Sequence, residues 1–170
     1  MGEPVIYTIK ISVRYQETDQ MGVAHHSVYP VWFEAGRAAF IRDYGLPYSK
    51  MEADGLYLPL IGLSCEYKGF SRFEDELEIK TRISDVTKTR MSFLYEVVKD
   101  GKIIAAGATT HIYANKLLKP VNLYKYMPGA YKLFRQIAGI GQPAEVESVS
   151  VSESVSESVS ESESVSISDE

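Results

Sequence analysis

Cysteine, tryptophan and long apolar runs are scarce in this chain of 170 residues. The single cysteine, Cys65, excludes an internal disulfide and any metal site built from several cysteines. No stretch approaches the roughly 18 consecutive apolar residues that a membrane-spanning helix needs, so no membrane segment is expected. The first ten residues lack a basic region followed by an apolar one. A secretory signal is therefore not expected, and the cytoplasm is the predicted location.

Basic residues are absent after residue 135, whereas 8 of the 23 acidic residues follow Pro143. Residues 1–142 contain 18 basic and 15 acidic residues, so their net charge is +3. This mild charge suits an anionic small molecule, and it is not the concentrated basic stripe typical of nucleic-acid binding. Serine occupies every second position from 148 to 168. Such low complexity and acidity predict a disordered tail at 143–170, after one folded domain at 1–142.

One long helix and five strands are expected within that domain. Apolar residues recur at helical spacing over 27–44, with Ser27 as a possible cap, Pro30 in the first turn and Gly45 beyond the end. Much of this helix is apolar around its circumference, so we expect other structure to surround it. Strand patterns cover 5–15, 57–70, 76–86, 90–99 and 102–113.

The order of these elements indicates the fold class. Asp100-Gly101 lies between the last two strands and predicts a tight hairpin. Residues 125–140 have the apolar spacing of a final short helix. One early apolar helix followed by consecutive strands favours an α+β fold in which an antiparallel sheet wraps around a central helix.

Residues 15–37 carry the most specific pattern in the sequence. Tyr15, Thr18-Asp19, Gly22-Val23, His26, Tyr29, Phe33-Glu34 and Arg37 occur at a spacing that resembles the 4-hydroxybenzoyl-CoA thioesterase and YbgC-type acyl-CoA thioesterase family. The resemblance continues more weakly to about residue 123 and does not cover the serine-rich tail. It implies a hotdog fold, in which a sheet wraps around a long helix. It also implies hydrolysis of an acyl-CoA thioester to a free acid and CoA without a cofactor. One departure is His25, where YbgC-type sequences commonly have an aromatic residue.

Asp19 is the candidate catalytic carboxylate that the resemblance implies, either as nucleophile or as general base. It precedes the expected helix, and backbone N–H groups at that helix N-terminus are suited to stabilise the oxyanion of a cleaved thioester. The alternative for Asp19 is an ordinary loop residue whose carboxylate makes an Asx-turn beside Gly22.

Four further residues of this segment are candidates for the site. His26 is expected to orient substrate or to offer its backbone N–H, or alternatively to cap the helix. Glu34 is the second candidate carboxylate, although an intrahelical or intersubunit ion pair with Arg37 is the simpler explanation. Tyr15 and Tyr29 are candidates for the acyl pocket, with core packing as the alternative.

Basic residues are expected to bind the phosphates of coenzyme A. Lys88 and Arg90, in an expected connection between strands, are the candidates, and Lys68 and Arg72 are weaker ones. No metal site is predicted, because the adjacent His25 and His26 lack further ligands at suitable spacing. Cys65 lies within a strand pattern, which is more typical of a buried thiol than of a nucleophile.

The partners follow from the same resemblance. A homodimer or homotetramer with sites between subunits is expected, with neither nucleic acid nor membrane as a partner. Two other functions remain open: a thioesterase acting on acyl-carrier-protein thioesters, and a hotdog module that binds acyl-CoA without cleaving it.

Overall fold

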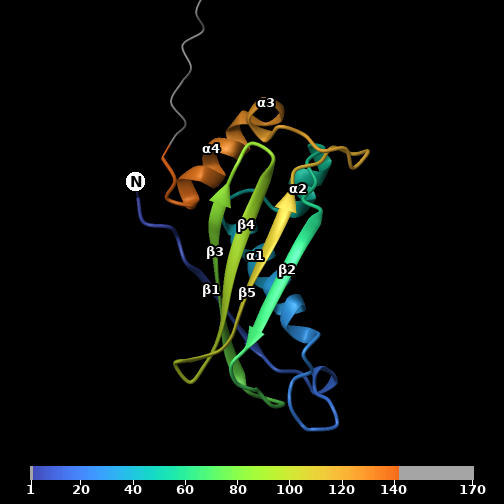
Figure 1. Ribbon diagram of the computed structural model, residues 1–170, viewed down its shortest axis with the longest axis vertical. Coiled ribbons are helices and arrows are strands. Elements are labelled where there is room, and N and C mark those ends of the chain that lie inside the picture. Colours follow the sequence, from blue (N-terminus) through green and yellow to red (C-terminus); the bar gives the residue numbers. More distant parts are fainter. Residues whose placement is uncertain (1, 142–170) are drawn as a thin grey trace, which may run out of the picture.

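The computed structural model describes residues 2–141, so the predicted acidic tail at 143–170 lies outside the described residues. Five strands form one antiparallel sheet, in the order β1-β3-β4-β5-β2 (Figure 1). The strands are β1 (Tyr7–Ser12), β2 (Leu60–Tyr67), β3 (Glu76–Val86), β4 (Arg90–Lys99) and β5 (Lys102–Ile112). The helices are η1 (Tyr15–Glu17), α1 (Val28–Asp43), α2 (Tyr48–Ala53), α3 (Leu123–Tyr126) and α4 (Pro128–Ile137).

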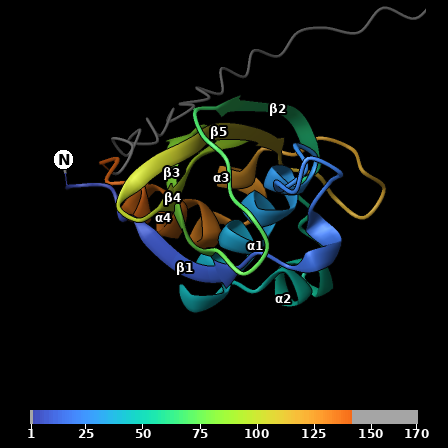
Figure 2. The ribbon, with the colours of Figure 1, turned by 90° about the horizontal axis from the view of Figure 1, so that it is seen from below.

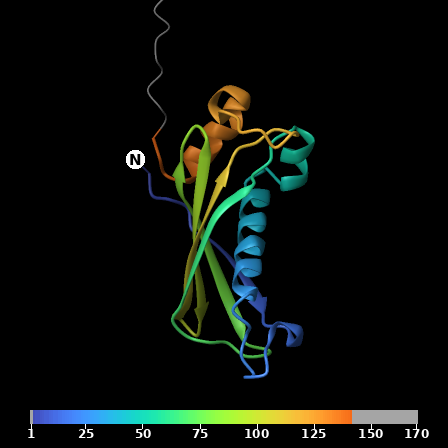
Figure 3. The same cartoon turned by 45° about the vertical axis from the view of Figure 1, so that its right-hand side comes forward.

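The sheet curves around α1, which lies along its concave face (Figures 2 and 3). Period-2 alternation produces this arrangement: in β3, buried Leu77, Ile79 and Ile83 alternate with partly exposed polar residues. The expected α+β hotdog architecture is therefore confirmed. No helix within residues 2–141 is both long enough and apolar enough to cross a membrane.

Two glycines allow α1 to approach the sheet closely. Gly36 faces β3, where an added Cβ would lie 2.5 Å from Oγ1 of Thr81. Gly107 of β5 lies beneath the ring of Phe33, which stacks on Tyr95 with a centroid separation of 4.6 Å. Only a residue without a side chain fits at these positions, so the two glycines determine the depth at which α1 packs.

The expectation that α1 is surrounded on all sides is wrong for the single chain. Val31 is 52% exposed, and Glu34 and Ala35 are exposed as well. The sheet covers one side of the helix, and its other side faces solvent in one chain. Ser27 does precede the helix, but its side chain makes no capping hydrogen bond, because its hydroxyl pairs with Nδ1 of His25 at 2.8 Å.

The remaining predictions are largely confirmed. Asp100 and Gly101 have φ angles of 49° and 74° and form the β4–β5 hairpin turn. The expected final helix is instead two helices, α3 and α4, because the non-helical Met127 and the following Pro128 interrupt it. The predicted strand over 5–15 is shorter and ends at Ser12.

Candidate functional site

Asp19 lies at the tip of a short hairpin just ahead of α1. Its N–H donates to the carbonyl of Val23 at 2.9 Å, and Thr18 forms an isolated bridge with Ala24. The hairpin closes where the N–H of His25 donates to the carbonyl of Glu17 at 2.8 Å. The two arms of the hairpin therefore carry Asp19 and the start of α1 on one small unit of structure.

The Asp19 carboxylate makes the Asx-turn that the sequence offered as the alternative interpretation. Oδ1 accepts a hydrogen bond from the N–H of Met21 at 2.9 Å, and the N–H of Gly22 donates to the Asp19 carbonyl. Within residues 2–141, Oδ2 accepts no hydrogen bond, and the side chain is half-buried. The turn orients one carboxylate oxygen and leaves the other available. Asp19 can therefore make the Asx-turn and still act as a catalytic carboxylate.

His26 follows the second arm of the hairpin, at the entrance to α1. Its backbone N–H makes no hydrogen bond to another described residue, whereas its carbonyl accepts from the Tyr67 hydroxyl at 2.9 Å. The imidazole is exposed and packs at a tilt against that of His25, with a centroid separation of 4.0 Å. A free N–H beside a helix N-terminus is the type of donor that an oxyanion requires.

The two tyrosine candidates lie in different environments. Tyr15 is 77% exposed and meets Phe73 edge-on at the surface, close to the Asp19 hairpin. Tyr29 is only 2% exposed and packs between Trp32 and Tyr67, and burial raises the pKa of its hydroxyl. Tyr15 thus has access to a ligand, whereas the position of Tyr29 agrees with the alternative of core packing.

Glu34 and Arg37 do not form the expected ion pair within the chain. Glu34 is exposed on the open side of α1, and within residues 2–141 no salt bridge joins it to Arg37. Arg37 instead points into the sheet, where Nε donates to the Tyr48 hydroxyl at 2.8 Å. Its Nη1 lies 3.1 Å from Nε2 of His111 on β5.

Lys88 and Arg90 lie far from the Asp19 hairpin of the same chain. Both are exposed at the β3–β4 turn, at the opposite end of the sheet (Figure 1). The weaker candidate Arg72 is close to the hairpin, because its Nη1 lies 3.9 Å from where a Cβ of Gly22 would stand. One chain therefore places Asp19, His26 and Arg72 on or beside one hairpin and leaves Lys88 and Arg90 at the other end of the sheet.

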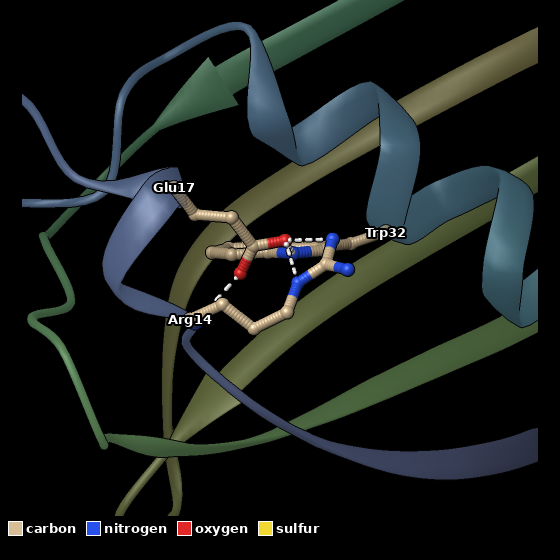
Figure 4. Close-up of polar contacts among 3 residues, drawn as sticks. All are labelled: Arg14, Glu17 and Trp32. Carbon is tan, nitrogen blue, oxygen red and sulfur yellow. Dashed lines mark hydrogen bonds and ion pairs between the residues drawn. The ribbon is translucent and has the colours of Figure 1, made fainter.

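Glu17 was missed by the sequence interpretation, although it lies only two residues before Asp19. Its side chain is 5% exposed and contacts both Arg14 and Trp32 (Figure 4). A glutamate in a polar loop carries no signal of burial, so neither composition nor spacing identifies it. Cys65 is half-buried, and burial raises the pKa of its thiol, which disfavours a nucleophilic thiolate. Within residues 2–141, no group of three His, Cys, Asp or Glu side chains is arranged to hold a metal.

The family follows from comparison with known proteins. A model of the thioesterase-like superfamily matches residues 13–152, which include the Asp19 hairpin, α1 and the strands β2 to β5. The chain belongs to this superfamily. Its relatives include YneP of Bacillus subtilis, a proposed acyl-CoA thioesterase, with 34% identity over 70% of this chain and 88% of that protein. The acyl-CoA thioester hydrolase YbgC of Escherichia coli is 27% identical over 52% of this chain and 66% of that protein.

Solved structures of this thioesterase family agree with the fold. The DHNA-CoA thioesterase of Staphylococcus aureus is 29% identical, with a TM-score of 0.75 over 79% of this chain and 91% of that chain. The hypothetical protein TT1821 of Thermus thermophilus is 34% identical, with a TM-score of 0.72 over 77% of this chain and 98% of that chain.

Proposed function

We propose that this thioesterase hydrolyses acyl-CoA, with Asp19 as its catalytic carboxylate. The observation that carries the proposal is the Asp19 hairpin: Oδ1 is held by the Met21 N–H, Oδ2 is free, and the unbonded N–H of His26 lies on the other arm. The names of YneP and YbgC support acyl-CoA as the substrate class.

The reaction needs an attack on the thioester carbonyl carbon. Asp19 either takes a proton from water, whose oxygen then attacks, or attacks directly to form an anhydride that water cleaves. The carbonyl oxygen becomes negative, and the His26 N–H and the positive end of the α1 dipole stabilise it. The C–S bond then breaks, and the departing CoA thiolate takes up the proton that Asp19 removed from water or, on the direct route, a proton released when water cleaves the anhydride. The products are the free acid and CoA.

Replacement of Asp19 by asparagine tests this role. Asparagine keeps the oxygen that accepts from Met21, so the Asx-turn survives while the charge and basicity are lost. We expect kcat to fall by about 10²- to 10⁴-fold, the range for loss of a general base. Asp54→Asn, at an exposed position after α2, is the matched control. An unchanged rate in Asp19→Asn would exclude the mechanism and favour an acyl-CoA-binding module.

The carrier and the acyl group need separate measurements. The same acyl chain is assayed as its CoA thioester and as its acyl-carrier-protein thioester, and we expect the CoA form to be preferred. A preference of more than about tenfold for the carrier protein would overturn the acyl-CoA proposal. A panel of short, long and aromatic acyl-CoAs then identifies the acyl class.

The partner is a second copy of the chain. β2 is an edge strand, and Leu60, Ile61, Leu63 and Tyr67 are 45% to 56% exposed along it. Exposed apolar edges promote pairing between chains. We propose antiparallel pairing of two β2 strands, which gives a two-fold dimer. Because Leu60 lies at the β3–β4 end and Tyr67 at the His26 end, this pairing brings one chain's Lys88 towards the other chain's Asp19. A tetramer of such dimers and the cytoplasmic location remain predictions.

A further inference from the structure

Glu17 is a buried carboxylate that accepts four hydrogen bonds from two neighbours. Oε2 accepts from the Arg14 backbone N–H at 2.9 Å. Oε1 accepts from Arg14 Nε at 3.0 Å and Nη2 at 2.6 Å, and from the Trp32 indole N–H at 3.2 Å. Figure 4 shows the carboxylate beside the Arg14 guanidinium, with the indole of Trp32, which comes from α1, close to both. Two pieces of the chain, the η1 turn that carries Glu17 with Arg14 at its N-cap and the helix α1 that carries Trp32, meet at this one side chain.

The backbone of Glu17 forms the base of the Asp19 hairpin. Its carbonyl accepts from the N–H of His25, which directly precedes the candidate oxyanion donor His26. Asp19 follows two residues after Glu17 on the same arm, opposite the arm that carries His25. The contact with Trp32 therefore joins the hairpin to α1, whose first turn begins at Val28. A shift of Glu17 would move Asp19 and His26 relative to α1.

The environment of Glu17 suits positioning and not proton transfer. Burial opposes its ionised form, but the hydrogen bonds from Arg14 and Trp32 outweigh it and hold the pKa of the carboxyl below its ordinary value. The carboxylate thus stays charged, and both of its oxygens are occupied. Buried ion pairs contribute little net stability, because desolvation offsets the attraction, so a role in fixing geometry is the more economical explanation.

We propose that Glu17 is a positioning residue for thioester hydrolysis, which holds the Asp19 hairpin against α1 through Arg14 and Trp32. The inference rests on the proposed function, since it concerns the geometry of the same site. A misplacement of about 1 Å in a catalytic group can cost about 10²-fold in rate. Loss of the Glu17 contacts should therefore lower kcat and leave KM nearly unchanged.

The test compares Glu17→Gln with Glu17→Asp and with the control Glu52→Gln on the exposed side of α2. Glutamine retains the size but places an N–H₂ donor where one oxygen accepted from Arg14 or Trp32. We expect kcat for acyl-CoA to fall by about tenfold to a hundredfold in Glu17→Gln, with KM within about threefold of wild type. Glu17→Asp should recover part of the loss because it restores the charge.

Trp32 provides a second readout that does not depend on turnover. It is the only tryptophan, so tryptophan fluorescence reports the environment of the indole that donates to Glu17. We expect the emission of Glu17→Gln to differ from wild type and that of Glu52→Gln to match it. If Glu17→Gln does not fold, Arg14→Gln replaces it, since that side chain is 61% exposed and can be changed with little loss of packing.

The outcomes separate the two proposals. If wild type and Glu52→Gln hydrolyse acyl-CoA but Glu17→Gln and Arg14→Gln keep the wild-type kcat, Glu17 has no positioning role. The same conclusion follows if the variants only unfold at lower temperature while kcat below that temperature is unchanged. If wild type itself hydrolyses no acyl-CoA, the proposed function fails, whatever the fluorescence shows.

Discussion

Nη1 of Arg37, in the middle of α1, lies 3.1 Å from Nε2 of His111 on β5. The other ring nitrogen of His111 lies 3.0 Å from the carbonyl oxygen of Leu58, an arrangement in which Nδ1–H donates and Nε2 accepts. This pattern requires a neutral ring. Burial, together with the positive charge of Arg37, lowers the pKa of His111 to about 4. A neutral buried histidine thus accepts a hydrogen bond from the central helix.

This relationship predicts a loss of stability in mild acid. The folded-state pKa is below the unfolded-state value of about 6.5, so the unfolded chain binds more protons as the pH falls. The free energy of unfolding should therefore decrease by about 2 kcal/mol between about pH 7 and about pH 5 because of this one group. His111→Gln should be less stable at neutral pH but should show a smaller decrease. Urea unfolding across this range measures both slopes, and equal slopes would contradict the prediction.

Gly36 predicts a steric effect of a single methyl group. In Gly36→Ala the new Cβ would meet Oγ1 of Thr81 at 2.5 Å and Cγ2 of Ile79 at 3.0 Å, so α1 must move away from β3. Overpacking of this kind costs about 1–3 kcal/mol. Thr81 Oγ1 is buried without a hydrogen-bond partner, so Thr81→Ala removes the obstacle without breaking a bond.

A double-mutant cycle checks this prediction. We expect Gly36→Ala with Thr81→Ala to be more stable than the sum of the two single changes predicts. Gly129→Ala is the control, because no atom lies within 4 Å of its added Cβ in α4, and it should not destabilise the protein. Simple additivity of the Gly36 and Thr81 changes would refute the proposed contact.

Local sequence patterns predicted the helices, strands and turns well, but they did not predict contacts between residues that are far apart in the sequence. The turn at Asp100-Gly101 and the alternation in β3 reflect interactions between near neighbours, which the sequence displays directly. By contrast, Arg37 and His111 are 74 positions apart, and no periodicity indicates that they meet. The same is true of Trp32 and Glu17.

The site itself depended on the family pattern. Physical arguments from the sequence placed a loop with a carboxylate before a helix. They did not distinguish a catalytic Asp19 from an ordinary aspartate that makes an Asx-turn. The resemblance over residues 15–37 singled it out. The open side of α1 was not predicted, because an apolar helix looks the same whether its own chain or a second copy covers it.

The β2 edge predicts a variant that is monomeric. Ile61 is 56% exposed on this strand, and Ile61→Lys would place a charge in the proposed interface. We expect light scattering to show a smaller mass for Ile61→Lys than for wild type. Leu117→Lys, at a loop position that is 75% exposed, is the control and should keep the wild-type mass. A monomeric wild-type protein, or an Ile61→Lys of unchanged mass, would count against β2 pairing.

The positions of Lys88 and Arg90 predict that they serve the Asp19 site of another chain. The Asp19 hairpin of their own chain lies at the opposite end of the sheet. The double change Lys88→Ala with Arg90→Ala should raise KM about tenfold for acyl-CoA, because the phosphates of coenzyme A lose two positively charged binding partners. It should not change KM for an acyl thioester that lacks the nucleotide.

Mixed dimers test the direction of this contact. A chain with Asp19→Asn, paired with a chain that carries Lys88→Ala and Arg90→Ala, has one intact site only if the basic residues act across the interface. We then expect subunit exchange to restore the wild-type KM at about half of the wild-type kcat, or less where exchange is incomplete. If the basic residues act within their own chain, every active site of the mixture has lost them, and KM stays high. The dimer geometry predicts the first result because antiparallel β2 pairing places opposite ends of the two sheets together.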